Sequence, residues 1–161
     1  MRHPTLAIAL AFALALIASP LLAEPATDFT LKAADGSNYR LAEQRGELVL
    51  INFWASWCGP CRQEMPQLDK LAAEFADLGV QVVGVNVEQE TADAEQFLKG
   101  SPVSFPVLWD GSNSTAKAYA VGGMPTTVIV DRNGDIRYRH AGYQPGDEQQ
   151  YREQLKKLVR E

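Results

Sequence analysis

Residues 48–66 read LVLINFWASWCGPCRQEMP and contain the only two cysteines of the chain, Cys58 and Cys61. The stretch opens with a continuous apolar run, Leu48–Trp54, which is typical of a buried central strand. Gly and Pro separate the cysteines, and a helical pattern follows them. Such a pair can be a redox disulfide, half of a metal site or two core cysteines, and the rest of the chain has to distinguish these.

The sequence after this stretch predicts an α/β domain. Apolar residues recur at helical spacing over 65–78, and 80–87 is a second continuous apolar run. Strand, helix and strand in this order indicate a parallel pair with a right-handed crossover. The Asp-Gly pair at 35–36 and the Asn-Gly pair at 133–134 each mark a hairpin. We therefore expect a parallel core extended by antiparallel strands.

Shorter elements are expected around this core. A Pro-containing leader occupies 24–27, and Thr91 is a candidate N-cap for the helix that follows it. The remaining elements are expected as strands at 29–32, 39–41, 103–109, 126–131 and 136–141, and as helices at 91–99, 114–120 and 147–160.

The first 23 residues are typical of an export signal. Arg2 and the amino terminus are positive, residues 6–18 are all apolar, and cleavage is expected after Ala23. An uncleaved membrane anchor is the alternative, although a spanning helix needs about 20 apolar residues. We expect a signal peptide or anchor at 1–23 and one domain at 24–161, located in the periplasm or another extracytoplasmic compartment.

Composition and charge narrow the function classes. The net charge is -5, so no basic surface is available to neutralise phosphates and we expect no nucleic-acid partner. In an oxidising compartment the two cysteines can form a disulfide, but the ring is so small that it constrains little unfolded-chain entropy. A disulfide that contributes so little stability indicates a role in chemistry.

The position of the cysteines predicts their roles. Cys58 follows a central strand and opens a helix, whose unpaired N–H groups and dipole favour thiolate, so it should be the exposed nucleophile. Gly59 is expected to let the chain turn tightly, which brings the Cys61 N–H toward the Cys58 sulfur. Pro60 fits the first helical turn, where an N–H would be unpaired. Cys61 is then the resolving thiol of a disulfide exchange.

The metal interpretation lacks ligands. A zinc site needs two further ligands beside a Cys-x-x-Cys pair. No other cysteine exists, and the two histidines are His3, within the expected signal, and His140, isolated on a predicted strand. Two buried structural cysteines are hard to reconcile with Gly-Pro between them at a helix start. We expect a redox pair, no metal and no cofactor.

The sequence resembles a thioredoxin. FWASWCGPC at 53–61 is similar to the active-site motif of that family, and GGMPTTVIVDRNG at 122–134 is similar to its second signature. The resemblance implies a thioredoxin-like fold, with a central mixed sheet and flanking helices. It also implies that Pro125 is a cis proline against the disulfide and that Met124 offers backbone groups to an extended substrate. Trp57 would shield one side of the disulfide and contact partners.

A narrower resemblance is to the TlpA/ResA-like branch. It is carried by the export signal, FTLKAADGSNYRLAEQRGELVLINFW at 29–54, CRQEMP at 61–66 and an extra segment at about 88–110. Members are extracytoplasmic thiol–disulfide oxidoreductases, many of them membrane-held reductants and several active in cytochrome c maturation. The resemblance implies an N-terminal β-hairpin, a small insertion, protein disulfide substrates such as apocytochrome c, and a membrane electron donor.

One departure from thioredoxin concerns the proton of the resolving cysteine. The buried aspartate of thioredoxin is matched by Asn52, which cannot take up a proton. Glu64 lies three residues after Cys61, on a neighbouring helix face, and matches a glutamate that the TlpA/ResA-like branch places near its active site. Glu64 is therefore a candidate proton acceptor for Cys61. A solvated helix glutamate is the alternative.

Together these features predict an exported monomeric thiol–disulfide oxidoreductase that uses Cys58 and Cys61 on protein clients. The Gly-Pro dipeptide is that of thioredoxin, whose potential is about −270 mV against about −120 mV for the oxidant DsbA, and it favours a reductant without fixing the direction. Two alternatives stay open. One is a peroxiredoxin-like peroxidase, and the other is a redox-dependent client-binding or copper-site assembly partner without net turnover.

Overall fold

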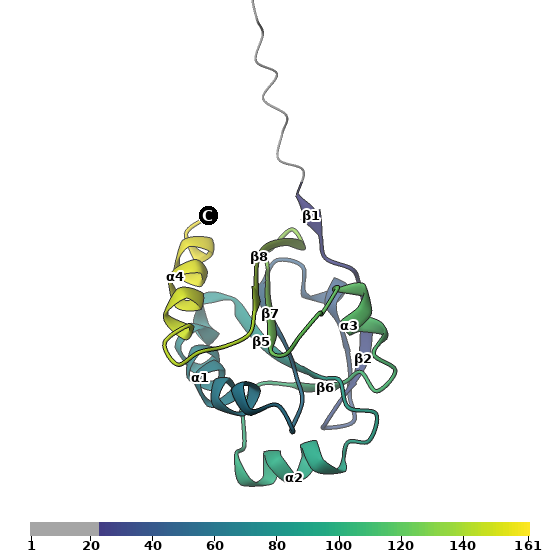
Figure 1. The fold of residues 1–161 in the computed structure, drawn as a ribbon. Helices are drawn as coiled ribbons and strands as arrows, with labels where there is room; N and C mark the ends of the chain where they lie inside the picture. The colour runs from purple at the N-terminus through teal and green to yellow at the C-terminus, as the bar shows by residue number, and fades with distance from the viewer. Residues whose placement is uncertain (1–22) are drawn as a thin grey trace, which may run out of the picture.

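The computed structural model describes residues 23–161, which form a central mixed sheet with helices on both faces (Figure 1). The expected signal or anchor at 1–23 lies outside the described residues except for Ala23. Within 23–161, none of the helices combines the length and the apolar character that crossing a membrane requires.

The described sheet has eight strands in the order β1-β8-β7-β4-β5-β6-β2-β3. Its strands are β1 (Glu24–Pro25), β2 (Thr30–Ala33), β3 (Asn38–Arg40), β4 (Leu48–Trp54), β5 (Val80–Asn86), β6 (Val107–Trp109), β7 (Thr126–Val130) and β8 (Asp135–Ala141). The helices are α1 (Gly59–Phe75), α2 (Ala92–Gly100), α3 (Ser114–Ala118) and α4 (Glu148–Val159), with 3₁₀ helices at Leu41–Gln44 and Ala76–Leu78.

Strand β4 is the centre of the sheet and is buried along its whole length. It pairs in parallel with β5 and antiparallel with β7, and β5 pairs in parallel with β6. Because side chains alternate along a strand, Leu50 and Trp54 join the core that contains residues of α1 and α4, whereas Ile51 and Phe53 join the core on the α3 face. Asn52 shares the face of Leu50 and therefore points toward α1.

Helix α1 begins at Gly59, directly after Cys58, and continues as a single helix through Pro66. Its buried residues recur at helical spacing, as the sequence predicted: Cys61, Glu64, Met65, Leu68, Leu71 and Phe75. A 3₁₀ turn follows, and Gly79, at a φ of 71°, ends it in the left-handed region that glycine adopts most readily. Both predicted hairpins and the parallel β4–β5 pair are confirmed.

Three local details differ from the sequence analysis. The leader at 24–27 contains a short strand that the sequence analysis did not predict, because Glu24 and Pro25 form β1 and pair with β8. Thr91 is the N-cap residue of α2, as predicted, but its side chain forms no capping bond, because its hydroxyl donates to the Glu95 side chain at 2.8 Å instead of accepting from the backbone. The extended piece expected at 103–109 is a strand only over Val107–Trp109.

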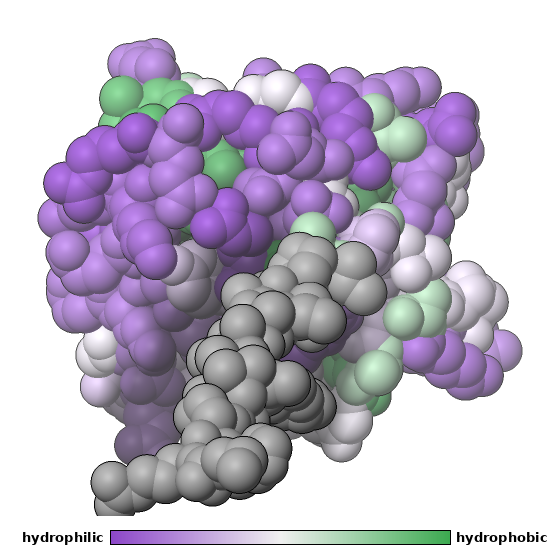
Figure 2. Space-filling view, turned by 90° about the horizontal axis from the view of Figure 1, so that it is seen from above, coloured by the Kyte–Doolittle hydropathy of each residue, from purple (hydrophilic) through white to green (hydrophobic). Residues whose placement is uncertain are grey.

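The segment at about 88–110 supplies both α2 and β6. Strand β6 lies between β5 and β2, so it connects the N-terminal hairpin to the sheet. The face seen from above in Figure 2 is mostly hydrophilic, with apolar side chains in separate patches. The apolar residues that the sequence pattern assigned to strands and helices lie mainly in the two core clusters, one on each face of the sheet.

Candidate active site

The two cysteines lie where the carboxyl end of β4 passes into α1. Cys58 is the N-cap residue of α1 and forms a disulfide with Cys61. The backbone N–H of Cys61 donates to the Cys58 sulfur at 3.2 Å. In the reduced state this N–H and the positive end of the helix dipole stabilise a Cys58 thiolate. The sequence prediction for the approach of the Cys61 N–H is therefore confirmed.

The two cysteines are much less exposed to solvent than Trp57, the residue before Cys58. Cys58 is 5% exposed and Cys61 is fully buried, so Cys58 is the more accessible sulfur but is less exposed than the sequence suggested. Both cysteines belong to the core cluster under α1, and this packing explains why Cys58 is less exposed than expected. Trp57, in contrast, is 70% exposed. A partner that reaches Cys58 therefore meets the Trp57 ring beside it.

Gly59 and Pro60 occupy the first turn of α1. Pro60 needs no N–H there, as expected. The expected need for glycine at 59 is wrong: its φ is not in the left-handed region, and an added Cβ would meet no atom within 4 Å. The space around Gly59 therefore accommodates an alanine without steric conflict.

The Met124–Pro125 peptide bond is cis, as the resemblance to thioredoxin implied. Met124 is partly buried and packs against the core cluster that contains both cysteines. Thr126, which follows Pro125, donates from its hydroxyl to the Gly123 carbonyl at 2.7 Å and closes the loop. The second signature thus contributes a turned loop to the same core cluster as the disulfide.

Glu64 is fully buried, not solvated. Its Oε1 accepts hydrogen bonds from the Tyr151 hydroxyl at 2.9 Å and the Thr127 hydroxyl at 3.1 Å, and its Oε2 accepts from Asn52 Nδ2 at 2.8 Å. The three donors come from α4, β7 and β4, so the carboxyl joins the sheet to both helices on this face. Asn52 Nδ2 also donates to the Thr127 hydroxyl at 2.9 Å.

Burial raises the pKa of Glu64 to about 7, although the hydrogen bonds from Tyr151, Thr127 and Asn52 act in the opposite direction. The carboxyl can therefore exist in either protonation state near neutral pH. Burial and the neighbouring Glu64 carboxylate also raise the pKa of Tyr151 far above its usual value, so its hydroxyl stays a proton donor in the hydrogen bond.

Sequence reasoning missed a second carboxylate, Glu88, which holds the loop before Cys58. Its oxygens accept from the Ser56 N–H and the Ser56 hydroxyl, both at 2.7 Å, and from Asn86 Nδ2 at 2.8 Å. A signal was present, because Asn86 ends β5 and polar residues at the carboxyl ends of parallel strands meet at one edge of a sheet.

Thr127 and Tyr151 were not singled out from the sequence as site residues either. Both read as ordinary members of a strand and a helix face, and only the packing of α4 and β7 against α1 brings them to Glu64.

Other polar groups in the described part do not extend this site. Within residues 23–161, no group of three or more His, Cys, Asp or Glu side chains is placed to hold a metal ion. His140, on β8, packs on the Tyr151 ring with the ring centroids 4.8 Å apart. Its Nε2 lies 2.8 Å from Gln154 Oε1.

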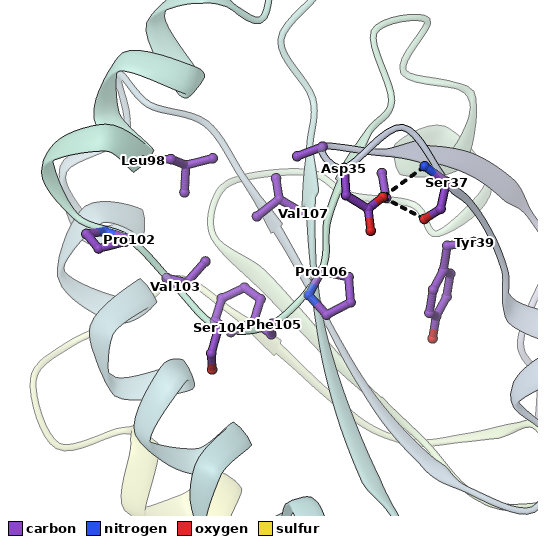
Figure 3. Close-up of a pocket in the computed structure, with 12 residues that line it drawn as sticks. Asp35, Ser37, Tyr39, Leu98, Pro102, Val103, Ser104, Phe105, Pro106 and Val107 are labelled. Atoms are coloured by element: carbon purple, nitrogen blue, oxygen red, sulfur yellow. Dashed lines mark hydrogen bonds between the residues drawn. The ribbon is translucent and has the colours of Figure 1, made fainter.

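A separate cavity of about 390 Å³ lies between the β2–β3 turn and residues 98–107. Figure 3 shows Asp35 joined to Ser37 by two hydrogen bonds on one side, with Leu98 and Val103 on the other. Its lining is largely apolar and includes neither cysteine. This cavity is therefore separate from the two cysteines.

The fold and the disulfide at the start of α1 define a protein of the thioredoxin superfamily. Residues 22–155 match the family model described as Redoxin. The crystal structure of a Chlorobium tepidum protein, assigned as the thiol:disulfide interchange protein DsbE, has a TM-score of 0.82 and 38% identity to this chain, and the match covers 85% of this chain and 96% of that one. The chain belongs to the Redoxin family and is ResA-like.

Two curated relatives illustrate this similarity. The chain is 37% identical over 112 residues to Thiol-disulfide oxidoreductase ResA of Geobacillus thermodenitrificans, a match that covers 70% of this chain and 64% of that protein. It is 41% identical over 122 residues to Thioredoxin-like protein YneN of Bacillus subtilis, covering 74% of this chain and 71% of that protein. The match thus spans about two thirds of the length of the ResA relative.

Proposed function

We propose that this chain is an exported thiol–disulfide oxidoreductase that reduces disulfides in protein clients. The observation that supports this most directly is the Cys58–Cys61 disulfide at the N-terminus of α1, where the helix favours a thiolate on Cys58. The similarity to ResA and DsbE proteins supports the same class of reaction.

The reaction follows from the order of the two sulfurs. In the dithiol form the Cys58 thiolate attacks a client disulfide, the client S–S bond breaks, and one client sulfur leaves as a thiolate that takes up a proton. Cys61 then loses its proton and attacks the Cys58 sulfur, which releases the second client thiol and forms the Cys58–Cys61 disulfide. Two electrons pass to the client, and another protein must return two electrons to the chain.

Glu64 is the proposed acceptor of the Cys61 proton. It is one helical turn beyond Cys61, both side chains are buried, and its pKa of about 7 lets the carboxylate take up a proton at neutral pH. Asn52 cannot exchange a proton, and its role is to donate a hydrogen bond that orients the Glu64 carboxylate. The alternative of a solvated glutamate does not agree with this burial.

The residues around the disulfide have proposed roles toward the client. Trp57 offers an exposed aromatic surface beside Cys58, and Met124, before the cis Pro125, offers backbone groups to an extended client segment. Cys58 retains only slight exposure, so a client has to approach along this surface to reach the sulfur.

The cellular setting is also part of the proposal. The apolar N-terminal sequence supports export to the periplasm or another extracytoplasmic compartment, followed by cleavage after Ala23 or retention as an anchor. Apocytochrome c is the proposed client and a membrane protein the proposed electron donor, both on the resemblance to the TlpA/ResA-like branch. The chain is proposed to act as a monomer.

The reduction potential of the Cys58–Cys61 pair tests the proposed direction. Titration of the mature protein with dithiothreitol should give a value near that of thioredoxin, about −270 mV. A value near that of DsbA, about −120 mV, would identify an oxidant and refute the cytochrome proposal. Cys61→Ser should then trap clients as mixed disulfides on Cys58, and Cys58→Ser should trap none.

A further inference from the structure

An open groove of about 570 Å³ is lined by residues that are adjacent in sequence to the two cysteines. Trp57 and Arg62, which flank the two cysteines in sequence, line it from one side, and Asp93 and Phe97 of α2 line it from the other. The groove is therefore bounded by the active-site motif and by the segment at about 88–110, which ordinary thioredoxins lack according to the resemblance. A polypeptide bound at Cys58 passes within reach of it.

One wall of the groove is fixed by hydrogen bonds. Ser56 lines the groove, and its N–H and hydroxyl both donate to the Glu88 carboxylate at 2.7 Å. Asn86 Nδ2 donates to the same carboxylate at 2.8 Å. The backbone next to Trp57 is thereby held in place while the Trp57 side chain stays 70% exposed. Binding at this wall needs little further ordering of the loop.

Arg62 supplies a positioned positive charge. Its guanidinium lies over the Phe97 ring, 5.3 Å from the centroid, in a cation–π contact. Among the described residues 23–161 its guanidinium forms no ion pair, although Asp93 lines the same groove. The contact with the ring is not an ion pair, and arginine binds a carboxylate through paired guanidinium N–H donors.

We propose that this groove is a client subsite in which Arg62 pairs with a carboxylate close in sequence to the client's reactive cysteine, while Trp57 contacts apolar atoms of the same segment. The occupant is an extended polypeptide with an Asp or Glu near its cysteine. The inference rests on the proposed disulfide exchange at Cys58 and names the client sequence that the exchange favours.

Synthetic peptides test this subsite. Each peptide carries one cysteine as a mixed disulfide with thionitrobenzoate, and the residues next to it include Glu, Gln or Lys at one matched position. The Cys58 thiolate bonds to the peptide sulfur and releases coloured thionitrobenzoate, and Cys61 then displaces the peptide thiol and forms the protein disulfide. Single-turnover rates with the fully reduced mature protein are divided by the rate with neutral 2-hydroxyethyl disulfide, so that changes in thiol reactivity cancel.

The Glu peptide should react faster than the Gln peptide by roughly two- to fivefold, the range expected of an exposed ion pair, and the Lys peptide should react more slowly. Added salt should shrink the difference. Arg62→Gln should abolish the Glu preference, and Arg62→Lys should retain part of it. Lys70→Gln, which removes the same charge from α1 outside the groove, should retain all of it.

A Glu preference that survives in Arg62→Gln, or one that Lys70→Gln removes equally well, would overturn the subsite. Equal rates for all peptides with the wild-type protein would overturn it too, while leaving the proposed exchange reaction in place. Failure to reduce any peptide or 2-hydroxyethyl disulfide would instead refute the proposed function, and the subsite would fall with it.

Discussion

Replacing Glu64 by Gln removes a titrating group from the interior and keeps the shape of the side chain. The carboxyl is fully buried and accepts hydrogen bonds from Asn52, Thr127 and Tyr151. The new amide has a place for its N–H, because Asn52 Oδ1 is buried without a hydrogen-bond partner among the described residues and can turn toward it. Glu64→Gln should therefore fold, and its main effect should be on the pH dependence of stability.

The sign and size of this effect follow from the raised pKa. Burial raises the pKa of Glu64 from its ordinary value of 4.5 to about 7. Between these two values the folded protein holds a proton that the unfolded chain releases, so the free energy of unfolding falls as the pH rises. At about 1.4 kcal/mol per pKa unit, the stability lost between about pH 5 and about pH 8 through this group is roughly 2.5 kcal/mol.

Urea unfolding of the oxidised protein measures this loss without interference from thiol titration. Wild type should lose roughly 2.5 kcal/mol more than Glu64→Gln between about pH 5 and about pH 8. Glu90→Gln is the control, because it makes the same chemical change at an exposed position and should leave the pH dependence of wild type intact. Parallel pH profiles for wild type and Glu64→Gln would refute both the raised pKa of Glu64 and its proposed role as proton acceptor.

Three further substitutions test the packing around the site by urea unfolding. Gly59→Ala should change stability by less than about 1 kcal/mol, because an added Cβ meets no atom within 4 Å; a larger loss would show that the motif needs glycine for its backbone. Gly84→Ala should cost roughly 1–3 kcal/mol, because its Cβ would lie 3.1 Å from the buried Trp54 indole nitrogen, and a neutral result would contradict the tight packing there. Tyr151→Phe should cost roughly 1–3 kcal/mol and more at high than at low pH, because an ionised Glu64 loses a donor; equal losses at both pH values would argue against that hydrogen bond.

The fold was predictable where local pattern and tertiary packing agree. The apolar run of β4 and the helical spacing of α1 each require a buried face, and the structure buries both. Strand β1 gave no such signal, because Glu24 and Pro25 are exposed and their strand exists only through pairing with β8. Thr91 has the sequence of a cap, but its hydroxyl donates to the neighbouring Glu95 side chain.

For the candidate site, the sequence was enough to predict the cysteine pair but not the surroundings of the proposed proton acceptor, Glu64. Cys58 and Cys61 are three residues apart, so a short motif specifies their geometry. The surroundings of Glu64 depend on Thr127 and Tyr151, which are 63 and 87 residues away in sequence and reach it only when the whole domain has folded. A single helix position therefore could not reveal whether this carboxyl is solvated or buried.

The pairing of β6 has a consequence for the modularity of the domain. Strand β2 hydrogen-bonds to β3 on one side and to β6 on the other, so the N-terminal hairpin joins the sheet ladder only through a strand from the segment at about 88–110. What look in sequence like two unrelated additions to a thioredoxin core, one before it and one inside it, are a single structural unit. A chimaera that transplants either addition alone would leave an open sheet edge, so the two should be exchanged, lost or grafted together.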